Sequence, residues 1–267
     1  MKKVGIVGYG IIGQAVNNLF KGCISKDFRV YPYDTNIDTL KSEDYKNRIK
    51  ECDIIFVCVP TPHNKYDGLD MSIVESVVDE FDPELFVICS ALQPGTADRL
   101  METYGKKIVV QPEYFGETTK HPLTNLSQTD FLILGGDSYC VNKVIELYQV
   151  AYNANIKIRK VSALEAEVIK LSENRAIAYK VSQCQELYDV CKAADVDYET
   201  IRQAVYGDDP RFNLWWTWVY EENRGCNSKC IPKDVYGWHK WATDNGMEPQ
   251  LTEDLIEYND KLISDNL

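Results

Sequence analysis

Six short apolar runs, separated by polar or amphipathic stretches, constrain the fold of this 267-residue chain more than any other feature. The runs lie at residues 3–8, 28–33, 53–59, 84–90, 107–111 and 130–136. Each run is continuously apolar rather than alternating, which indicates strands that are buried on both faces, as in a parallel sheet. The intervals between the runs have room for helical crossovers. The N-terminal half therefore predicts a doubly wound, mostly parallel α/β sheet.

A glycine-rich turn follows the first run. The sequence GYGIIG at residues 8–13 has G-x-G-x-x-G spacing between a predicted strand and a predicted helix. Gly8 permits a tight turn, Gly10 lets a pyrophosphate approach the backbone, and Gly13 allows close packing of helix and strand. The domain is therefore predicted to be Rossmann-like. Its predicted dinucleotide cradle consists of Gly8, Gly10, Ile11, Ile12 and Gly13.

Two further positions complete the predicted cofactor site. Asp34 ends the second run, where a carboxylate can accept hydrogen bonds from ribose hydroxyls, and no arginine follows it closely to bind a 2′-phosphate. NAD is therefore favoured over NADP. Pro60 and Thr61 follow the third run, at the carboxyl end of the sheet, where Thr61 could donate to the cofactor. A rigid proline-bounded loop without a binding role explains the same residues equally well.

Composition restricts the class of partner. The formal net charge of −12 argues against nucleic acid and anionic membranes as partners. No apolar run approaches the roughly 20 residues of a spanning helix. The nine cysteines are irregularly spaced and odd in number, which is typical of reduced thiols in a cytoplasm. We therefore expect a cytoplasmic protein. An anionic small molecule stays possible as a partner, because it needs only a local basic pocket.

A long helix is predicted to open the second half. Residues 162–195 contain neither proline nor glycine, and Ser162 with Glu165 forms a capping box. Because this helix exceeds the usual length, we expect it to link two domains and to pack against a second subunit in a homodimer. Lys170 and Asn174 lie one turn apart on it. The predicted domains are a dinucleotide-binding domain at 1–155 and an all-helical domain at 160–267.

The sequence NRGCNSKCIPKDVYGW at residues 223–238 contains two cysteines four positions apart, with Lys233 and Asp234 after the second. A metal site would need two more ligands, and the three histidines and the other cysteines show no matching pair spacing. No metal is therefore predicted. Cys230 is either a buried core residue or a nucleophile whose thiolate neighbouring lysines would stabilise.

The order and spacing of several motifs resemble the UDP-glucose/GDP-mannose 6-dehydrogenase family over essentially the whole chain. The motifs are VGIVGYGIIG, VCVPTP followed by DGLDMS, SALQPGT, PEYFGE, EAEVIKLSEN, DPR and CIPKD. This family oxidises the C6 alcohol of a nucleotide sugar to a carboxylate in two NAD-dependent steps, through a cysteine thiohemiacetal and thioester. The resemblance implies NAD as cofactor and a nucleotide sugar as substrate.

The same resemblance assigns roles to individual residues. Cys230 matches the nucleophile. Lys170 and Asn174 match the residues that stabilise the oxyanion and position water, and Asp234 matches the residue that orients the water and the lysine. Glu113 and Glu117 match a pair of loop glutamates of which one activates water. Arg211 and Lys233 match basic residues that contact the substrate, and Arg211 would reach it across a dimer interface.

The chain also departs from the family pattern. Glycines that precede the family's cysteine appear as Asn227, Ser228 and Lys229, a threonine appears as Ala91, and Gly116 stands where arginine is common. The family's third, nucleotide-binding domain has no counterpart in these 267 residues. Two alternatives to the four-electron enzyme therefore stay open. They are a two-electron dehydrogenase of the hydroxyacid type and a non-catalytic dimeric NAD-binding protein.

Overall fold

The computed structural model of the chain describes residues 2–21, 28–64, 67–116, 129–149, 151–152 and 155–265. It divides into two compact units, each described by itself. Unit 1 comprises residues 1–62 and 70–170, and unit 2 comprises residues 63–69 and 171–267. A short hairpin inserted into the sequence of the first unit thus belongs to the second.

Unit 1 is built on a seven-stranded sheet with the order β2-β1-β3-β6-β7-β8-β9. All six apolar runs form strands, and among the pairings described within this sheet only that of β7 with β8 is antiparallel. The prediction of a mostly parallel, Rossmann-like sheet is therefore confirmed. The strands are β1 (Lys2–Val7), β2 (Phe28–Tyr33), β3 (Ile54–Val57), β6 (Leu85–Ile88), β7 (Ile108–Val110), β8 (Phe131–Gly135) and β9 (Lys157–Val161).

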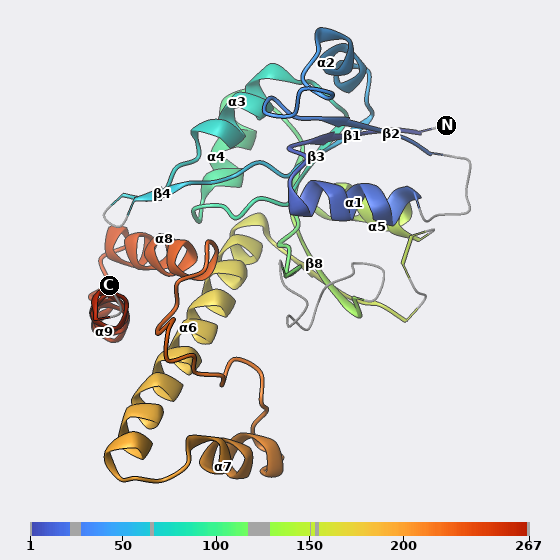
Figure 1. The fold of residues 1–267 in the computed structure, drawn as a ribbon. Helices are drawn as coiled ribbons and strands as arrows, with labels where there is room; N and C mark the ends of the chain where they lie inside the picture. Colours follow the sequence, from blue (N-terminus) through green and yellow to red (C-terminus); the bar gives the residue numbers. More distant parts are fainter. Residues whose placement is uncertain are drawn as a thin grey trace. The chain divides into compact units, whose positions relative to one another are not determined.

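Helices cover both faces of this sheet (Figure 1). Helices α1 and α5 lie together on one face, where Val16, Phe20 and Val144 pack on the strands in one apolar cluster. Helices α3 and α4 contact each other. This burial on both sides explains why the inner strands β3, β6 and β7 are continuously apolar, since every residue in them is buried. The helices are α1 (Ile11–Lys21), α2 (Glu43–Lys50), α3 (Ser72–Glu80), α4 (Thr96–Tyr104) and α5 (Ser138–Tyr148).

The predicted long helix is α6 (Ala163–Ala193), which begins in unit 1 and continues into unit 2. Its N-terminus has the expected capping box. Ser162 Oγ accepts from the backbone N–H of Glu165, and the Glu165 carboxylate accepts from the backbone N–H of Ser162. The prediction of a long helix between the sheet and the helical region is confirmed.

Unit 2 consists of the rest of α6, further helices and the hairpin of β4 (His63–Asn64) and β5 (Gly68–Leu69). Ala178 of α6, Val235 of α8 and Leu255 of α9 meet in its apolar core, which also contains Cys226. The hairpin packs on α8. The helices are α7 (Tyr198–Arg202), η2 (Gln203–Asp208), α8 (Ile231–Asp244) and α9 (Gln250–Ser264).

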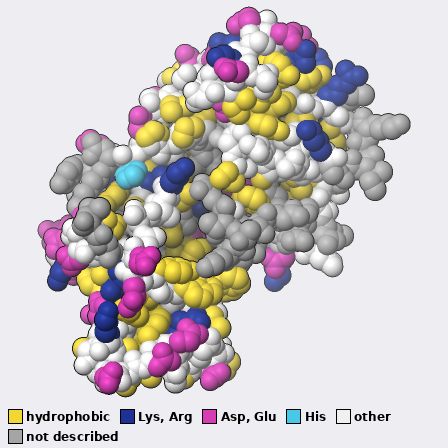
Figure 2. Space-filling model, viewed as in Figure 1, with side chains coloured by type: hydrophobic (Ala, Val, Ile, Leu, Met, Phe, Trp, Pro, Cys, Tyr) yellow, Lys and Arg dark blue, Asp and Glu magenta, His cyan; other side chains and the backbone are white. Residues whose placement is uncertain are grey.

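The surface is in keeping with the acidic composition. On the face drawn in Figure 2, Lys and Arg side chains are scattered among Asp and Glu and do not merge into a basic patch. Among the described residues, no helix is both long and apolar enough to cross a membrane.

Candidate functional site

The glycine turn of unit 1 forms a backbone cradle between β1 and α1. Gly8 has φ +89°, and a Cβ there would lie 2.5 Å from the carbonyl oxygen of Cys58. A Cβ on Gly13 would lie 2.0 Å from the carbonyl oxygen of Gly8. Both positions therefore require glycine. Gly10 is different, because a Cβ there would meet no atom within 4 Å, which leaves room beside the helix N-terminus.

The other predicted cofactor residues lie at the same edge of the sheet. Ile11 and Ile12 form the first turn of α1, with Ile11 exposed and Ile12 packed on the core. Asp34 directly follows β2, and its two carboxylate oxygens accept from the backbone N–H groups of Tyr9 (2.7 Å) and Asn36 (2.8 Å). These bonds fix the carboxylate beside the turn and leave lone pairs for ribose hydroxyls.

The loop after β3 contributes Pro60, which is exposed, and Thr61, which is 5% exposed. Ser90, which follows β6, donates to the carbonyl oxygen of Val59 at 2.7 Å and so joins the two neighbouring loops. The open space at Gly10, the fixed Asp34 carboxylate and the amide donors at the start of α1 fit a dinucleotide.

Glu113, which follows β7, is the most perturbed carboxyl among the predicted catalytic residues. Burial raises its pKa from 4.5 to about 7, although hydrogen bonding from Gln111 and the charge of Lys170 lower it. The Lys170 ammonium donates to the carbonyl oxygen of Glu113 at 2.8 Å. Unit 1 therefore brings Glu113 and Lys170 together. Glu117 lies outside the described residues.

Unit 2 contains the predicted nucleophile. Cys230 is exposed and occupies the N-cap position of α8, where its carbonyl oxygen accepts from the backbone N–H of Asp234 at 3.2 Å. A helix N-terminus stabilises a thiolate, because its amide groups carry partial positive charge. Cys230 is therefore an exposed thiol at a helix N-terminus and not a buried core residue.

A buried polar cluster lies one helical turn beyond Cys230. The Asp234 side chain is fully buried; Asn174 of α6 donates to one of its oxygens at 2.5 Å, and Lys233 pairs with the other at 2.7 Å. Three predicted residues from two helices are therefore joined through one carboxylate. A buried carboxylate held by two donors has a fixed orientation, as a positioning group requires.

Sequence reasoning missed the residues that hold the loop before Cys230. Asn259 of α9 accepts from the Cys226 N–H at 2.6 Å and donates to the Cys226 carbonyl at 3.2 Å. Gly225 has φ +80°, and a Cβ there would lie 2.8 Å from the Asn259 side-chain oxygen. Ser228, at one of the positions that depart from the family, accepts from the Ile231 N–H at 3.2 Å and so caps α8. In the sequence, the glycine before Cys226 was the one signal that the backbone turns sharply here, because glycine tolerates a positive φ.

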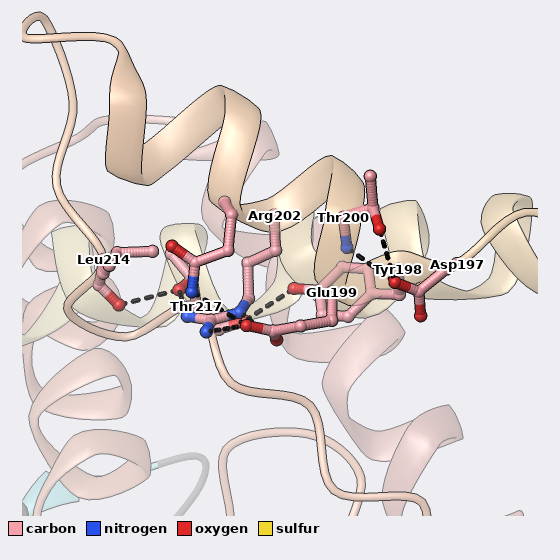
Figure 3. A network of polar contacts seen from close by, with 8 residues as sticks. Asp197, Tyr198, Glu199, Thr200, Arg202, Leu214 and Thr217 are labelled. Atoms are coloured by element: carbon pink, nitrogen blue, oxygen red, sulfur yellow. Dashed lines mark hydrogen bonds and ion pairs between the residues drawn. The ribbon is translucent and has the colours of Figure 1, made fainter.

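Arg211, unlike Asp234 and Asn174, has an exposed side chain. Its side chain is 80% exposed and pairs with Asp209 at 2.5 Å. The segment that follows is anchored by a network at α7 (Figure 3). There the buried Arg202 guanidinium binds Glu199 at 2.6 Å and Thr217 at 3.0 Å, and the Tyr198 hydroxyl donates to the Thr217 carbonyl at 2.6 Å.

His63 is a further residue for which the sequence predicted no role. Its ring stacks on Tyr236 of α8, with centroids 5.3 Å apart and an interplanar angle of 18°. Burial and the charge of Lys233 lower the pKa of His63, while Asp234 raises it. The lowered pKa favours the neutral form of the His63 imidazole. Within the described part of the chain, no group of three or more His, Cys, Asp or Glu side chains could hold a metal.

Comparisons with known proteins agree with this arrangement. The NAD binding domain of the UDP-glucose/GDP-mannose dehydrogenase family matches residues 33–152, and the central domain of the same family matches residues 164–261. The UDP-glucose 6-dehydrogenase of Haloferax volcanii is 25% identical over 245 residues, which cover 84% of this chain and 56% of the relative. The chain thus spans little more than half of that relative's length.

Two solved structures show the same fold. A UDP-glucose dehydrogenase from Pyrobaculum islandicum has a TM-score of 0.80 at 21% identity, with 98% of this chain and 68% of that one covered. The 3-hydroxyisobutyrate dehydrogenase of Mycobacterium tuberculosis has a TM-score of 0.74 at 14% identity, with 100% and 95% covered. At such identities the likeness concerns the fold alone.

Proposed function

Because the chain belongs to the UDP-glucose/GDP-mannose dehydrogenase family, we propose that it is an NAD-dependent nucleotide-sugar 6-dehydrogenase, with UDP-glucose as the first substrate to test. The observation that carries the proposal is the position of Cys230 at the N-terminus of α8, one turn before the buried Asp234. A two-electron dehydrogenase would need no such thiol.

The cradle at Gly8, Gly10 and Gly13, with Asp34 and the Pro60–Thr61 loop, would hold NAD, which supplies the hydride acceptor for both oxidations. The Cys230 thiolate adds to the aldehyde carbon and forms a thiohemiacetal, and after the second oxidation it holds that carbon as a thioester. Asn174, Lys233 and Asp234 orient the groups around the reacting carbon.

Glu113 is the proposed base for the hydrolytic step. With a pKa of about 7 it is about half ionised at neutral pH, where a general base is most effective. It takes a proton from water as the water oxygen attacks the thioester carbon. The C–S bond then breaks and Cys230 leaves as a thiolate. The carboxylic acid that forms loses its proton to solvent and is released as the carboxylate. The Lys170 ammonium stabilises the oxyanion that forms during this attack.

Roles for two further residues are proposed by family analogy. Arg211, with its exposed guanidinium, contacts the substrate of a neighbouring subunit in a homodimer formed through α6. Glu117 assists Glu113. Both assignments are separable from the role of Cys230, because neither residue takes part in forming the thioester.

The test is the number of NADH molecules formed per molecule of sugar. UDP-glucose, UDP-galactose, UDP-GlcNAc, UDP-ManNAc and GDP-mannose are each supplied in limiting amount to the wild type, Cys230→Ser and Cys226→Ser. Cys226 is the matched control, since it lies in the same loop but is 6% exposed, and burial raises its pKa to about 12. We expect two NADH per sugar from the wild type and Cys226→Ser, and loss of the second in Cys230→Ser.

Full acid production by Cys230→Ser would refute the role of the thiol. One NADH per sugar from the wild type, with a carbonyl product, would instead identify a two-electron dehydrogenase. NAD binding without NADH formation from any of the five sugars would leave a cofactor-binding protein without this activity.

A further inference from the structure

A chain of buried hydrogen bonds leads from helix α5 to the carboxylate of Glu113. Gln111 follows β7 and is fully buried. Its side-chain NH2 donates to one oxygen of Glu113 at 2.5 Å, and its side-chain oxygen accepts from the Tyr148 hydroxyl at 2.5 Å. Tyr148 is 2% exposed, so water does not compete for these bonds.

The direction of each bond in this chain follows from chemistry. An ionised carboxylate only accepts hydrogen bonds, so the amide must turn its NH2 group toward Glu113. The amide oxygen then faces Tyr148, whose hydroxyl must donate. Without that donor, the amide of Gln111 could turn over and place its oxygen against the carboxylate, which would repel it.

We propose that Gln111 and Tyr148 are positioning residues that hold the Glu113 carboxylate in place and keep it available as the base for thioester hydrolysis. This inference rests on the proposed function of Glu113. It explains what orients the Glu113 carboxylate. It also gives a role to the buried side chains of Gln111 and Tyr148, which bind neither cofactor nor substrate in the proposed mechanism.

The surroundings of Glu113 agree with this role. Burial raises its pKa to about 7, and the bond from Gln111 is the larger of the two effects that lower it, the other being the charge of Lys170 of α6. Three further titratable groups face it: Cys89 after β6, Tyr148 of α5 and Tyr152. Burial raises the pKa of both tyrosines far above neutrality, so the Tyr148 hydroxyl keeps its proton for donation.

Tyr152 offers a matched control. Its ring meets that of Tyr148 edge to face with centroids 5.0 Å apart, and it is 9% exposed. Its hydroxyl is buried and has no hydrogen-bond partner in the part of the chain that the structure describes. Tyr152→Phe therefore removes a buried hydroxyl from the same aromatic cluster without interrupting the hydrogen-bond chain.

The experiment compares the wild type, Tyr148→Phe, Gln111→Met and Tyr152→Phe by two readouts. The first is the pH profile of acid release from the thioester. The second is an infrared titration of the Glu113 carboxyl without substrate, taken as the difference from Glu113→Gln. Loss of a hydrogen bond to a charged group shifts the midpoint upward by about one pH unit or more.

We expect Gln111→Met and Tyr148→Phe to raise the midpoint in both readouts. A rise of about one pH unit from 7 lowers acid release at pH 7 about fivefold, because the ionised fraction falls from about one half to about one tenth. KM for the nucleotide sugar should stay within about twofold, since the substrate touches neither residue. Tyr152→Phe should match the wild type.

Unchanged midpoints in both Tyr148→Phe and Gln111→Met, or an equal shift in Tyr152→Phe, would overturn the inference. If Gln111→Met does not fold, Tyr148→Phe decides, because it only removes one hydroxyl. Unimpaired hydrolysis by Glu113→Gln would refute the base assignment and with it the catalytic purpose of the chain. The infrared midpoints would still decide whether Gln111 and Tyr148 set the ionisation of that carboxyl.

Discussion

Glu167 of α6 makes a sharp prediction about stability, because its carboxylate is buried yet bonded only to backbone groups in the bonds described. The residue is 1% exposed, and its two oxygens accept from the backbone N–H groups of Gly95 (2.6 Å) and Ala97 (2.8 Å) at the start of α4. Burial raises the pKa of Glu167 from 4.5 to about 7, and the two backbone bonds lower it by less.

The sign of the effect follows from proton linkage. The folded state binds this proton more tightly than the unfolded state, so Glu167 adds stability below pH 4.5, and that stability is lost as pH rises through about 7. A difference of about 2.5 pH units corresponds to about 3.4 kcal/mol in full. Between pH 8 and pH 5 the expected gain is about 2.5 kcal/mol.

Glu167→Gln removes this titration. Urea unfolding of both proteins at pH 5, 6, 7 and 8 gives the difference in unfolding free energy at each pH. Losing one acceptor bond destabilises the variant by about 1 to 3 kcal/mol at every pH. In addition to this constant difference, the unfolding free energy of the wild type should exceed that of Glu167→Gln by a further amount of about 2.5 kcal/mol as pH falls from 8 to 5.

Glu165→Gln is the control, two residues away on the same helix. Its exposed carboxylate accepts from the backbone and hydroxyl of Ser162, and these bonds lower the pKa of Glu165. Its contribution is therefore present above the unfolded pKa and lost as pH falls, with a sign opposite to that of Glu167. A wild-type advantage over Glu167→Gln that stays constant, or grows toward pH 8, would refute the reasoning.

Three further predictions concern two glycines of the cradle and one residue that holds the cysteine loop. Gly13→Ala should destabilise the protein in urea by about 3 kcal/mol or more, because its Cβ would overlap the carbonyl oxygen of Gly8. Gly10→Ala should leave stability within about 0.5 kcal/mol but weaken NAD binding about tenfold or more by calorimetry, because a Cβ there occupies only the space proposed for pyrophosphate. Asn259→Ala removes both side-chain bonds to Cys226 and should destabilise by about 1 to 3 kcal/mol, with the second NADH per sugar slowed more than the first. Equal slowing of both would count against a role in holding the cysteine loop.

The strands could be predicted because burial on both faces leaves a direct trace in sequence. Every residue of Ile54–Val57 is 3% exposed or less, and the run is uniformly apolar. The edge strand Lys157–Val161 was missed for the opposite reason, since its charged residues face solvent. The hairpin at residues 63–69 has strands of two residues, too short for any period to be recognised.

The candidate site divides in the same way. Cys230, Asn174, Asp234 and the glycine turn were predicted through motifs in which residues close in sequence act together. The bond between Asn174 and Asp234 joins residues 60 positions apart, and that between Tyr148 and Gln111 spans 37. Outside a recognised motif, a buried polar side chain such as that of Gln111, Tyr148 or Asn259 cannot be told from a surface residue in the sequence. Only the fold shows that water is excluded and that a partner must be found.

Burial of carboxyl groups in unit 1 has opposite consequences for stability and for the proposed chemistry. Glu113 and Glu167 both have a pKa of about 7 in the folded state, so both lower stability as pH rises from 5 to 8. Over the same interval Glu113 gains the ionised form that hydrolysis requires. Glu167 takes no part in that step. Replacing it would make the unfolding free energy vary less with pH and would leave the pH dependence of hydrolysis unchanged. The pH of fastest acid release should therefore lie above the pH of greatest stability. In Glu167→Gln only one buried carboxyl still lowers stability as pH rises, so the pH of greatest stability should move up toward the pH of fastest acid release.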